Sequence, residues 1–236
     1  MKRFETETER IMARYRKRAQ CESDTRYIYT EHAVYMTVQE MERAMVRWIR
    51  SCGIRPVEDK KVLEIGCGTG PNLMWFVRVG FLPENLVGND LLPDRVGAAK
   101  RRLPAGCELL VSDALYLNIP DNGFDIVFQS TVFSSILDES FQTDLAARMW
   151  RWVKPGGGVL WYDFTYDNPR NPDVKGVGLQ RIRQLFPHGR MRYWRVTLAP
   201  PISRMVTRVH PCLYTLFNAV PALRTHVLCW IQKDQI

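Results

Sequence analysis

Residues 62–70 read VLEIGCGTG, and this stretch decides the fold. It begins with a mostly apolar run of strand length. Gly66, Gly68 and Gly70 follow at alternate positions, and Pro71 then suits the first turn of a helix. A strand that turns sharply into a helix places backbone N–H groups and the positive end of the helix dipole around a small polar ligand. The stretch therefore predicts a ligand-binding loop inside an α/β unit.

The spacing of these glycines distinguishes between ligands. Dinucleotide-binding loops have the form G-x-G-x-x-G, whereas here the third glycine comes one residue earlier and Glu64 precedes the first. Taken alone, this pattern also fits a glycine-rich turn that binds nothing. The form E-x-G-x-G-x-G resembles motif I of the class I (Rossmann-like) S-adenosylmethionine-dependent methyltransferases, of the bacterial small-molecule and glycan type. The resemblance implies that S-adenosylmethionine is bound by Glu64, Gly66, Cys67, Gly68 and Gly70.

Polar residues follow the next three predicted strands in the order that this family shows. Residues 86–88 lead to Asp90, an acid placed to accept both hydroxyls of a ribose. In the resemblance, Leu91 lies against the adenine, Asp113 accepts a hydrogen bond from the adenine amino group, and the backbone of Ala114 faces the ring. A strand over 124–129 ends at Gln129, which we assign to the cofactor site. Ser130 and Thr131 are expected to line the pocket floor near the sulfonium.

The remaining pattern completes an α/β order. A helix with apolar Phe141, Leu145, Met149 and Trp152 runs into Lys154-Pro-Gly-Gly, a turn typical of the family before its fifth strand. We predict a helix over 177–186, a strand over 192–198, a helix over 202–217 interrupted by Pro211, and a closing strand over 225–231 that lies antiparallel beside the sixth.

The resemblance therefore implies a doubly wound, mostly parallel seven-stranded sheet with helices on both faces. It is strong over residues 60–165. We expect residues 1–55 to form an N-terminal helical cap and residues 56–236 to form the methyltransferase domain, with a variable substrate-binding segment over about 164–224.

Composition indicates an ordinary soluble protein. Six dispersed cysteines without a C-x-x-C pair favour a reduced, cytoplasmic setting and indicate no metal site. The N-terminus lacks the apolar core of a signal peptide, and no apolar run is long enough for a transmembrane helix. Whether the chain forms a homo-oligomer stays open.

The net charge of +8 is unevenly placed, because residues 174–233 contain no Asp or Glu but many arginines. Arginine suits bidentate recognition of carboxylate or phosphate. One interpretation is an anionic substrate held near the methyl donor, with Arg192 and Arg195 as candidates. Others are peripheral contact with an anionic membrane, nucleic-acid binding, or a generally basic surface with no partner. We likewise interpret Arg14, Arg16, Lys17 and Arg18 as a solvated helix face.

Segments on either side of the core are expected to select the acceptor. An apolar stripe ending at Met45 and Trp48 favours core packing for the helix before the loop, and the aromatic segment at its start suggests Tyr29 and Tyr35 as substrate contacts. Packing of a helix junction is the alternative. Tyr166, in the loop after the fifth strand, is a further candidate. General-base candidates, none in a diagnostic motif, are Asp163 and His32, followed by His188.

We predict an enzyme that O-methylates an acidic or phosphorylated small molecule or glycan, a class that includes lipid-linked acceptors. The alternative is N- or O-methylation of a hydrophobic natural product with incidental arginines. The order QSTV at 129–132 replaces the D/N-P-P-Y pattern of enzymes that methylate amino groups of nucleic-acid bases, so nucleic acid is disfavoured. A basic nucleic-acid-binding module on the same fold ranks last.

Overall fold

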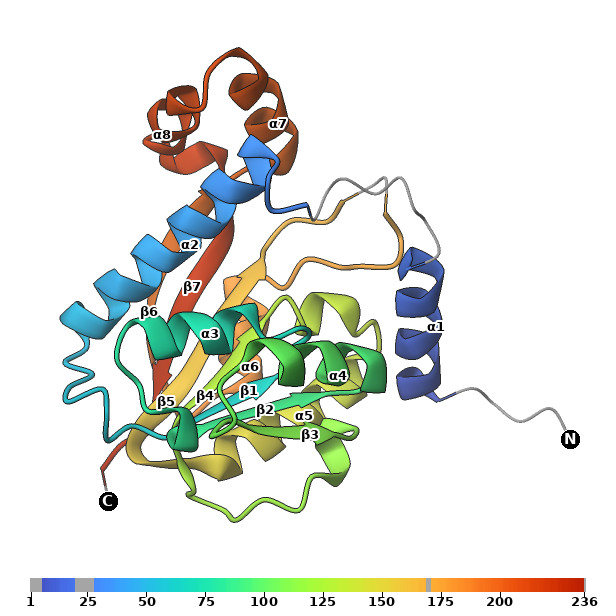
Figure 1. Ribbon diagram of the computed structural model, residues 1–236, viewed down its shortest axis with the longest axis vertical. Helices are drawn as coiled ribbons and strands as arrows, with labels where there is room; N and C mark the ends of the chain where they lie inside the picture. Colours follow the sequence, from blue (N-terminus) through green and yellow to red (C-terminus); the bar gives the residue numbers. More distant parts are fainter. Residues whose placement is uncertain (1–5, 20–27, 169–170, 236) are drawn as a thin grey trace, which may run out of the picture.

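The computed structural model describes residues 6–19, 28–168 and 171–235, and its centre is a seven-stranded sheet (Figure 1). The strand order is β3-β2-β1-β4-β5-β7-β6. β7 runs antiparallel to both of its neighbours, whereas the other pairings are parallel. The predicted fold class and the antiparallel closing strand are confirmed. The strands are β1 Val62–Ile65, β2 Leu86–Asp90, β3 Glu108–Val111, β4 Phe124–Ser130, β5 Val153–Phe164, β6 Arg190–Leu198 and β7 Arg224–Gln232.

Helices cover both faces of the sheet. One face carries α2 (His32–Ser51), α3 (Pro71–Arg78) and α4 (Pro93–Arg102), and the other carries α5 (Glu139–Trp152) and α6 (Leu179–Leu185). Three helices lie outside these two layers: α1 (Glu7–Ala19), α7 (Pro200–Val209) and α8 (Cys212–Asn218). Figure 1 shows α7 and α8 projecting from one end of the molecule, well away from α1. None of the described helices is long and apolar enough to cross a membrane.

The helix α2 belongs to the main core. Its Met45 and Trp48 are fully buried, and the Trp48 ring lies 5.3 Å from that of Trp230 on β7, measured between centroids. This confirms the predicted core role of the apolar stripe. The helix α1, in contrast, packs Ile11 into the core cluster on the opposite face of the sheet. The expected N-terminal cap is therefore two separate pieces in the described residues, and α2 is a layer of the domain.

The glycine loop has the geometry that its sequence predicts. Gly66, Gly68 and Gly70 have φ values of 70°, 57° and 82°, in the region that residues with a side chain rarely adopt. A Cβ added to Gly66 would lie 2.5 Å from a methyl carbon of Val132, and one added to Gly70 would lie 2.7 Å from Leu103. Glycine is thus required here both by dihedral angle and by space.

The segment after β6 also matches its prediction in outline. The helix expected over 202–217 is two helices, because α7 ends at Val209 and α8 begins at Cys212, after Pro211. Proline removes a backbone donor and clashes with the preceding turn, which explains the break. Both helices lie between Leu198 and Arg224, two residues that pair across β6 and β7. They therefore stand at the edge of the sheet where the parallel strands end.

Candidate active site

The carboxyl ends of β1, β2 and β4 meet at one edge of the sheet, where Ile65 pairs with both Asn89 and Gln129. A cavity of about 130 Å³ lies at this edge. Open parallel sheets place ligands at this position, beside the point where the strand order reverses. Of the predicted cofactor residues, five line the cavity, as do Ser130 and Thr131. The five are Gly66, Asp90, Leu91, Asp113 and Ala114.

Asp90 is held in place by backbone amides. Its carboxylate is 5% exposed and accepts hydrogen bonds from the N–H of Gly68 at 2.9 Å and from the N–H of Leu92 at 2.9 Å, one on each oxygen. Arg95 lies 3.9 Å from one of these oxygens. A carboxylate oxygen has two lone pairs, so each can accept a further hydrogen bond from the cavity side. This arrangement suits a pair of vicinal hydroxyls, as a ribose would present.

Glu64 lies beneath the glycine loop and is fully buried. One oxygen accepts a 2.7 Å hydrogen bond from the side-chain amide of Asn72, while the other, Oε2, has no partner. Burial raises the pKa of Glu64 from 4.5 to about 8, and the nearby Asp90 charge adds to the increase. A buried oxygen without a partner is costly. An ammonium group bound at the loop would offset that cost, so the residues here fit the amino-acid end of S-adenosylmethionine.

Asp113 lines the cavity at the end of β3, and both of its oxygens have partners. One accepts from the N–H of Leu115 at 2.9 Å, and the other accepts from the hydroxyl of Thr8 on α1. The Thr8 contact was not predicted, because the two residues are 105 positions apart. It joins α1 to the position at which the family resemblance places the adenine.

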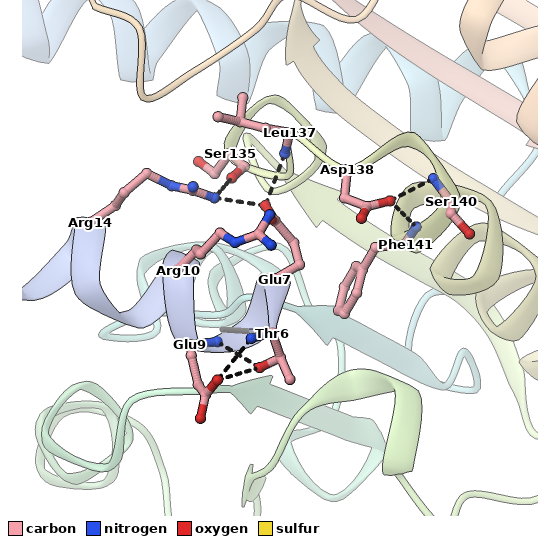
Figure 2. Close-up of polar contacts among 10 residues, drawn as sticks. All are labelled: Thr6, Glu7, Glu9, Arg10, Arg14, Ser135, Leu137, Asp138, Ser140 and Phe141. Atoms are coloured by element: carbon pink, nitrogen blue, oxygen red, sulfur yellow. Dashed lines mark hydrogen bonds and ion pairs between the residues drawn. The ribbon is translucent and has the colours of Figure 1, made fainter. Parts of the chain in front are cut away.

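The helix α1 covers the cavity and is held there by a buried acid (Figure 2). Glu7 has 3% of its side chain exposed, pairs with Arg14 at 2.8 Å, and accepts from the N–H of Leu137 at 3.1 Å. Arg14 also donates to the carbonyl of Ser135 at 2.9 Å. The interpretation of residues 14–18 as a solvated face is therefore wrong for Arg14, whose side chain is 14% exposed. The side chain of Arg18 lies outside the described residues.

Five predicted cofactor residues do not line the cavity, and three of them shape the loop from behind. Gln129 is fully buried, and its oxygen accepts from the N–H of Val132 at 3.0 Å, so it supports the turn after β4. Cys67 is buried in the core, where burial raises the pKa of its thiol. Gly70 forms the N-cap of α3. Of the other two, Gly68 donates its N–H to Asp90, and Glu64 lies beneath the loop with one oxygen unpaired.

Asp163 does not reach the cavity. Its carboxylate is fully buried and accepts from the N–H groups of Ser134 at 3.1 Å and Phe164 at 2.9 Å. Burial raises its pKa from 3.8 to about 7. The turn after β4 contains Ser134 and contributes Ser135 to the cavity wall. The geometry therefore indicates that Asp163 stabilises that turn, and it does not favour the role of a base that touches the acceptor.

The predicted histidines also lie away from the cavity wall. His32 is an exposed residue at the start of α2. His188 is exposed and precedes β6. The first residue of β6, Arg190, pairs with Gln232 of β7, and Gln232 pairs in turn with Gly158 in the first half of β5. His188 is therefore at the edge of the sheet opposite the cofactor cavity. In the part of the chain that the structure describes, no group of His, Cys, Asp and Glu could hold a metal ion.

The predicted substrate residues form two pairs and one isolated residue. The rings of Tyr29 and Tyr35 meet edge to face, with centroids 5.6 Å apart, and both side chains are about half exposed. Arg195 donates to the hydroxyl of Tyr166 at 3.1 Å. Arg192 donates to the carbonyl of Ser51 at 3.3 Å, at the end of α2. Arg195 is therefore available at the carboxyl edge of the sheet, whereas Arg192 supports a helix end.

The cavity also contains residues that sequence reasoning did not assign. From α1 come Ile11, Met12 and Tyr15, and the guanidinium of Arg95 lies over the Tyr15 ring at 5.2 Å. From the other side come Ser135, Ile136, Phe141 and Leu145. The spacing of Ile11 and Tyr15, four residues apart, was a visible signal for an inward helix face. Nothing local in the sequence indicates which surface that face covers.

Comparison with known proteins supports the assignment of this site. Residues 62–157 match the family model described as a methyltransferase domain, and this range carries the glycine loop, Asp90 and Asp113. This range is less than half of the chain, and together with the fold it supports a class I S-adenosylmethionine-dependent methyltransferase. Its fold is similar to that of an S-adenosylmethionine-dependent methyltransferase from Archaeoglobus fulgidus, with a TM-score of 0.60 and 18% identity over 89% of this chain and 100% of that one.

Two relatives share the central part of this chain. A fatty-acid O-methyltransferase of Mycolicibacterium smegmatis is 39% identical over 116 residues, which is 48% of this chain and 41% of the relative. Phosphoethanolamine N-methyltransferase 1 of Arabidopsis thaliana is 29% identical over 119 residues, 49% of this chain and 23% of the relative. The chain thus spans less than half the length of either relative.

Proposed function

We propose that this chain O-methylates the ionised acid group of an amphiphilic small molecule, with S-adenosylmethionine as the methyl donor. Donor binding rests on the glycine loop, on Asp90 with one backbone partner on each oxygen, and on the unpaired oxygen of Glu64. The nature of the acceptor rests on a different observation, which is the set of titratable groups around the cavity.

The described cavity lining has only two carboxylates, Asp90 and Asp113, and no histidine. Each of these carboxylates accepts a hydrogen bond from at least one backbone N–H, and Asp113 also accepts one from the Thr8 hydroxyl on α1. An alcohol or phenol needs a base near the reacting oxygen to remove its proton. A carboxylic acid has a pKa near 4 and is already ionised at neutral pH, so it needs none. The site therefore favours an acid as the acceptor.

When bound, S-adenosylmethionine supplies an electrophilic methyl carbon: the acceptor oxygen forms the new C–O bond as the C–S bond breaks, and no proton is transferred. The task of the chain is then alignment and exclusion of water. The helix α1 contributes to exclusion, because Ile11 and Met12 close one side of the cavity. Alignment at the acceptor side is assigned to Arg195, with Tyr166, Tyr29 and Tyr35 as further contacts.

One of the two relatives supports an amphiphilic acceptor. The Mycolicibacterium relative is named a fatty-acid O-methyltransferase, and a fatty acid combines a carboxylate with an apolar chain. The Arabidopsis relative is named for phosphoethanolamine, which presents an amine beside a phosphate. Both names refer to charged acceptors. The fatty-acid enzyme is named for O-methylation and the phosphoethanolamine enzyme for N-methylation, so only the former matches an acidic oxygen as the methylated group.

The test is transfer of labelled methyl from S-adenosylmethionine to three acceptors: palmitate, hexadecanol and phosphoethanolamine. Palmitate and hexadecanol share the same chain length and differ in whether the oxygen is ionised. We expect an alkali-labile methyl ester from palmitate and no product from hexadecanol. Equal transfer to hexadecanol would overturn the acid proposal by requiring a base, and transfer to phosphoethanolamine alone would favour N-methylation.

Two arginine variants provide matched controls for the acceptor side. Arg195→Gln is expected to raise the KM for palmitate by about tenfold with little change in kcat, because it removes a charge-assisted contact with the acid. Arg192→Gln is expected to leave the KM unchanged, since that side chain donates to Ser51 at the end of α2. Equal KM values for wild type and Arg195→Gln would contradict the role of Arg195.

A further inference from the structure

The two helices between β6 and β7 expose an unusual mixture of side chains. On α7, Ser203, Val206 and Thr207 are buried against the body of the protein, while the opposite side is open to solvent. We define the α7–α8 face as the exposed residues Arg204, Met205, Arg208, Val209, Leu216 and Val220. Of these, Val209 is 77% exposed, Leu216 65% and Met205 60%. Met205 and Val209 are one turn apart on α7, and neighbouring aliphatic residues this exposed are typical of contact surfaces.

The cations on this face have no acid beside them. Arg204 and Arg208 form no ion pair among the residues described, and residues 174–233 contain no Asp or Glu at all. On the adjoining helix α2, Glu40 lies near Tyr214 of α8 but is already paired with Arg43 at 3.0 Å. Arg204 and Arg208 are one helical turn apart, as are Met205 and Val209, so charge and apolar surface lie side by side.

We propose that the α7–α8 face docks on the surface of an anionic lipid bilayer. Exposed aliphatic side chains can enter the boundary between headgroups and acyl chains, while arginines beside them bind lipid phosphates. A nucleic acid would satisfy the arginines and leave the aliphatic residues in water. A second copy packed symmetrically on this face would bring arginines against arginines with no acid between them. The bilayer is the partner that matches both components.

The position of the face supports this assignment. Leu198 and Arg224, which flank the two helices, pair at the carboxyl edge of the sheet, where the cofactor cavity also lies. Figure 1 shows α7 and α8 projecting from one end of the molecule, beside the start of α2, so a flat surface can reach their outer side. Ser203 donates to the carbonyl of Ala33 at 3.5 Å, which places the start of α2, with exposed Tyr29 and Tyr35, beside α7. Docking would therefore bring the acceptor side of the enzyme to the lipid.

The experiment is co-sedimentation of the full chain with vesicles of phosphatidylcholine, with and without phosphatidylglycerol. We expect binding to the anionic vesicles that weakens with salt. The double variant R204E/R208E should lower partitioning by about tenfold or more, because each cation near an anionic surface contributes about a factor of five. M205S/V209S should also lower partitioning, by about tenfold, through loss of apolar insertion.

A matched charge control is R101E/R102E at the end of α4, where two exposed arginines lie at the opposite edge of the sheet. It should bind vesicles as the wild type does, apart from the small effect of net charge. All variants should retain their affinity for S-adenosylhomocysteine, which shows that they are folded and separates this proposal from the proposed reaction. Wild-type partitioning by R204E/R208E would overturn the proposal. The proposal would also be overturned if the wild-type chain did not bind vesicles but formed a dimer that M205S/V209S abolished.

Discussion

The two ends of the carboxyl edge use charged helices in opposite ways. At the cavity end, α1 turns Glu7 and Arg14 inward and closes the cofactor site through contacts with Ser135 and Leu137. At the other end, α7 turns Arg204 and Arg208 outward. Charge alone therefore does not tell which face of a helix is solvated. The burial of the partner acid decides it: Glu7 is buried, whereas Arg204 and Arg208 form no ion pair among the residues described.

The largest expected effect comes from filling the space at the glycine loop. In Gly66→Ala, the new Cβ would lie 2.5 Å from Val132 at a φ of 70°, so the turn must shift. We expect the affinity for S-adenosylhomocysteine, measured by calorimetry, to fall by about 100-fold or more. Gly178→Ala is the control, because its added Cβ meets nothing within 4 Å and its φ is negative. Vesicle binding should be unchanged in both variants.

The next largest effect concerns the buried pair that holds α1. Glu7→Ala leaves Arg14 without its carboxylate and the N–H of Leu137 without its acceptor. Breaking a buried charge pair is costly, so we expect α1 to detach and the affinity for S-adenosylhomocysteine to fall by about thirtyfold, or about 2 kcal/mol. Faster proteolysis within residues 6–19 would report the detachment directly. Glu7→Gln retains an acceptor for Leu137 and should give an intermediate loss; an affinity equal to that of wild type would contradict the closing role of α1.

A pH effect of intermediate size is expected at the cavity end. Burial raises the pKa of Glu64 to about 8 and that of Asp163 to about 7, above their ordinary values of 4.5 and 3.8. The folded chain thus holds protons that the unfolded chain releases. The free energy of unfolding of the ligand-free protein should therefore fall as the pH rises, on the order of 2 kcal/mol between about pH 6 and pH 8.

Denaturant titrations at several pH values would measure this slope. Glu64→Gln and Asp163→Asn should each flatten it, the first up to about pH 8 and the second up to about pH 7. The affinity for the donor should rise over the same range in wild type, because its ammonium favours the ionised form of Glu64. A pH-independent affinity that Glu64→Gln does not alter would show that Glu64 does not sense the ligand.

The smallest effect is expected from the α7–α8 face, at the other end of the carboxyl edge. R204E/R208E should change the affinity for S-adenosylhomocysteine by less than about twofold, because both side chains are exposed on the far end of the edge. Calorimetry under the conditions used for the Glu7 variants would check this. A loss comparable to that of Glu7→Ala would mean that the two ends are coupled and that the comparison fails.

The sequence predicted the cofactor end better than the acceptor end for a physical reason. The glycine spacing, Asp90 and Asp113 follow strands directly, so their positions depend on local turns and on the order of parallel strands. The position of Asp163 near the end of β5 is equally local, but its hydrogen-bond partner, the N–H of Ser134, lies on a separate turn. The sequence therefore did not show that this carboxylate is held away from the cavity. The sequence did not distinguish the roles of Arg192 and Arg195. The two side chains have different partners, Ser51 and Tyr166, and both partners are distant in sequence.

The inward face of α1 shows the same limit. The spacing of Ile11 and Tyr15 predicts an apolar stripe. The residues that bind this helix after β4, Ser135 and Leu137, are more than 120 positions away from their partners on it. Side-chain contacts over such separations depend on how whole layers pack. They are visible only after the fold is built.

The insertion of β7 between β5 and β6 has a consequence for how the molecule assembles. Every described strand pairing of β6 is with β7, so β6 cannot join the sheet until residues 224–232 are available. On a ribosome, the first five strands can pair while β6, α7 and α8 wait for the last strand of the sheet. The donor-binding edge can thus form before the helices that we assign to the bilayer take their place. A nascent chain halted before β7 would expose the edge of β5 to chaperones and to other chains.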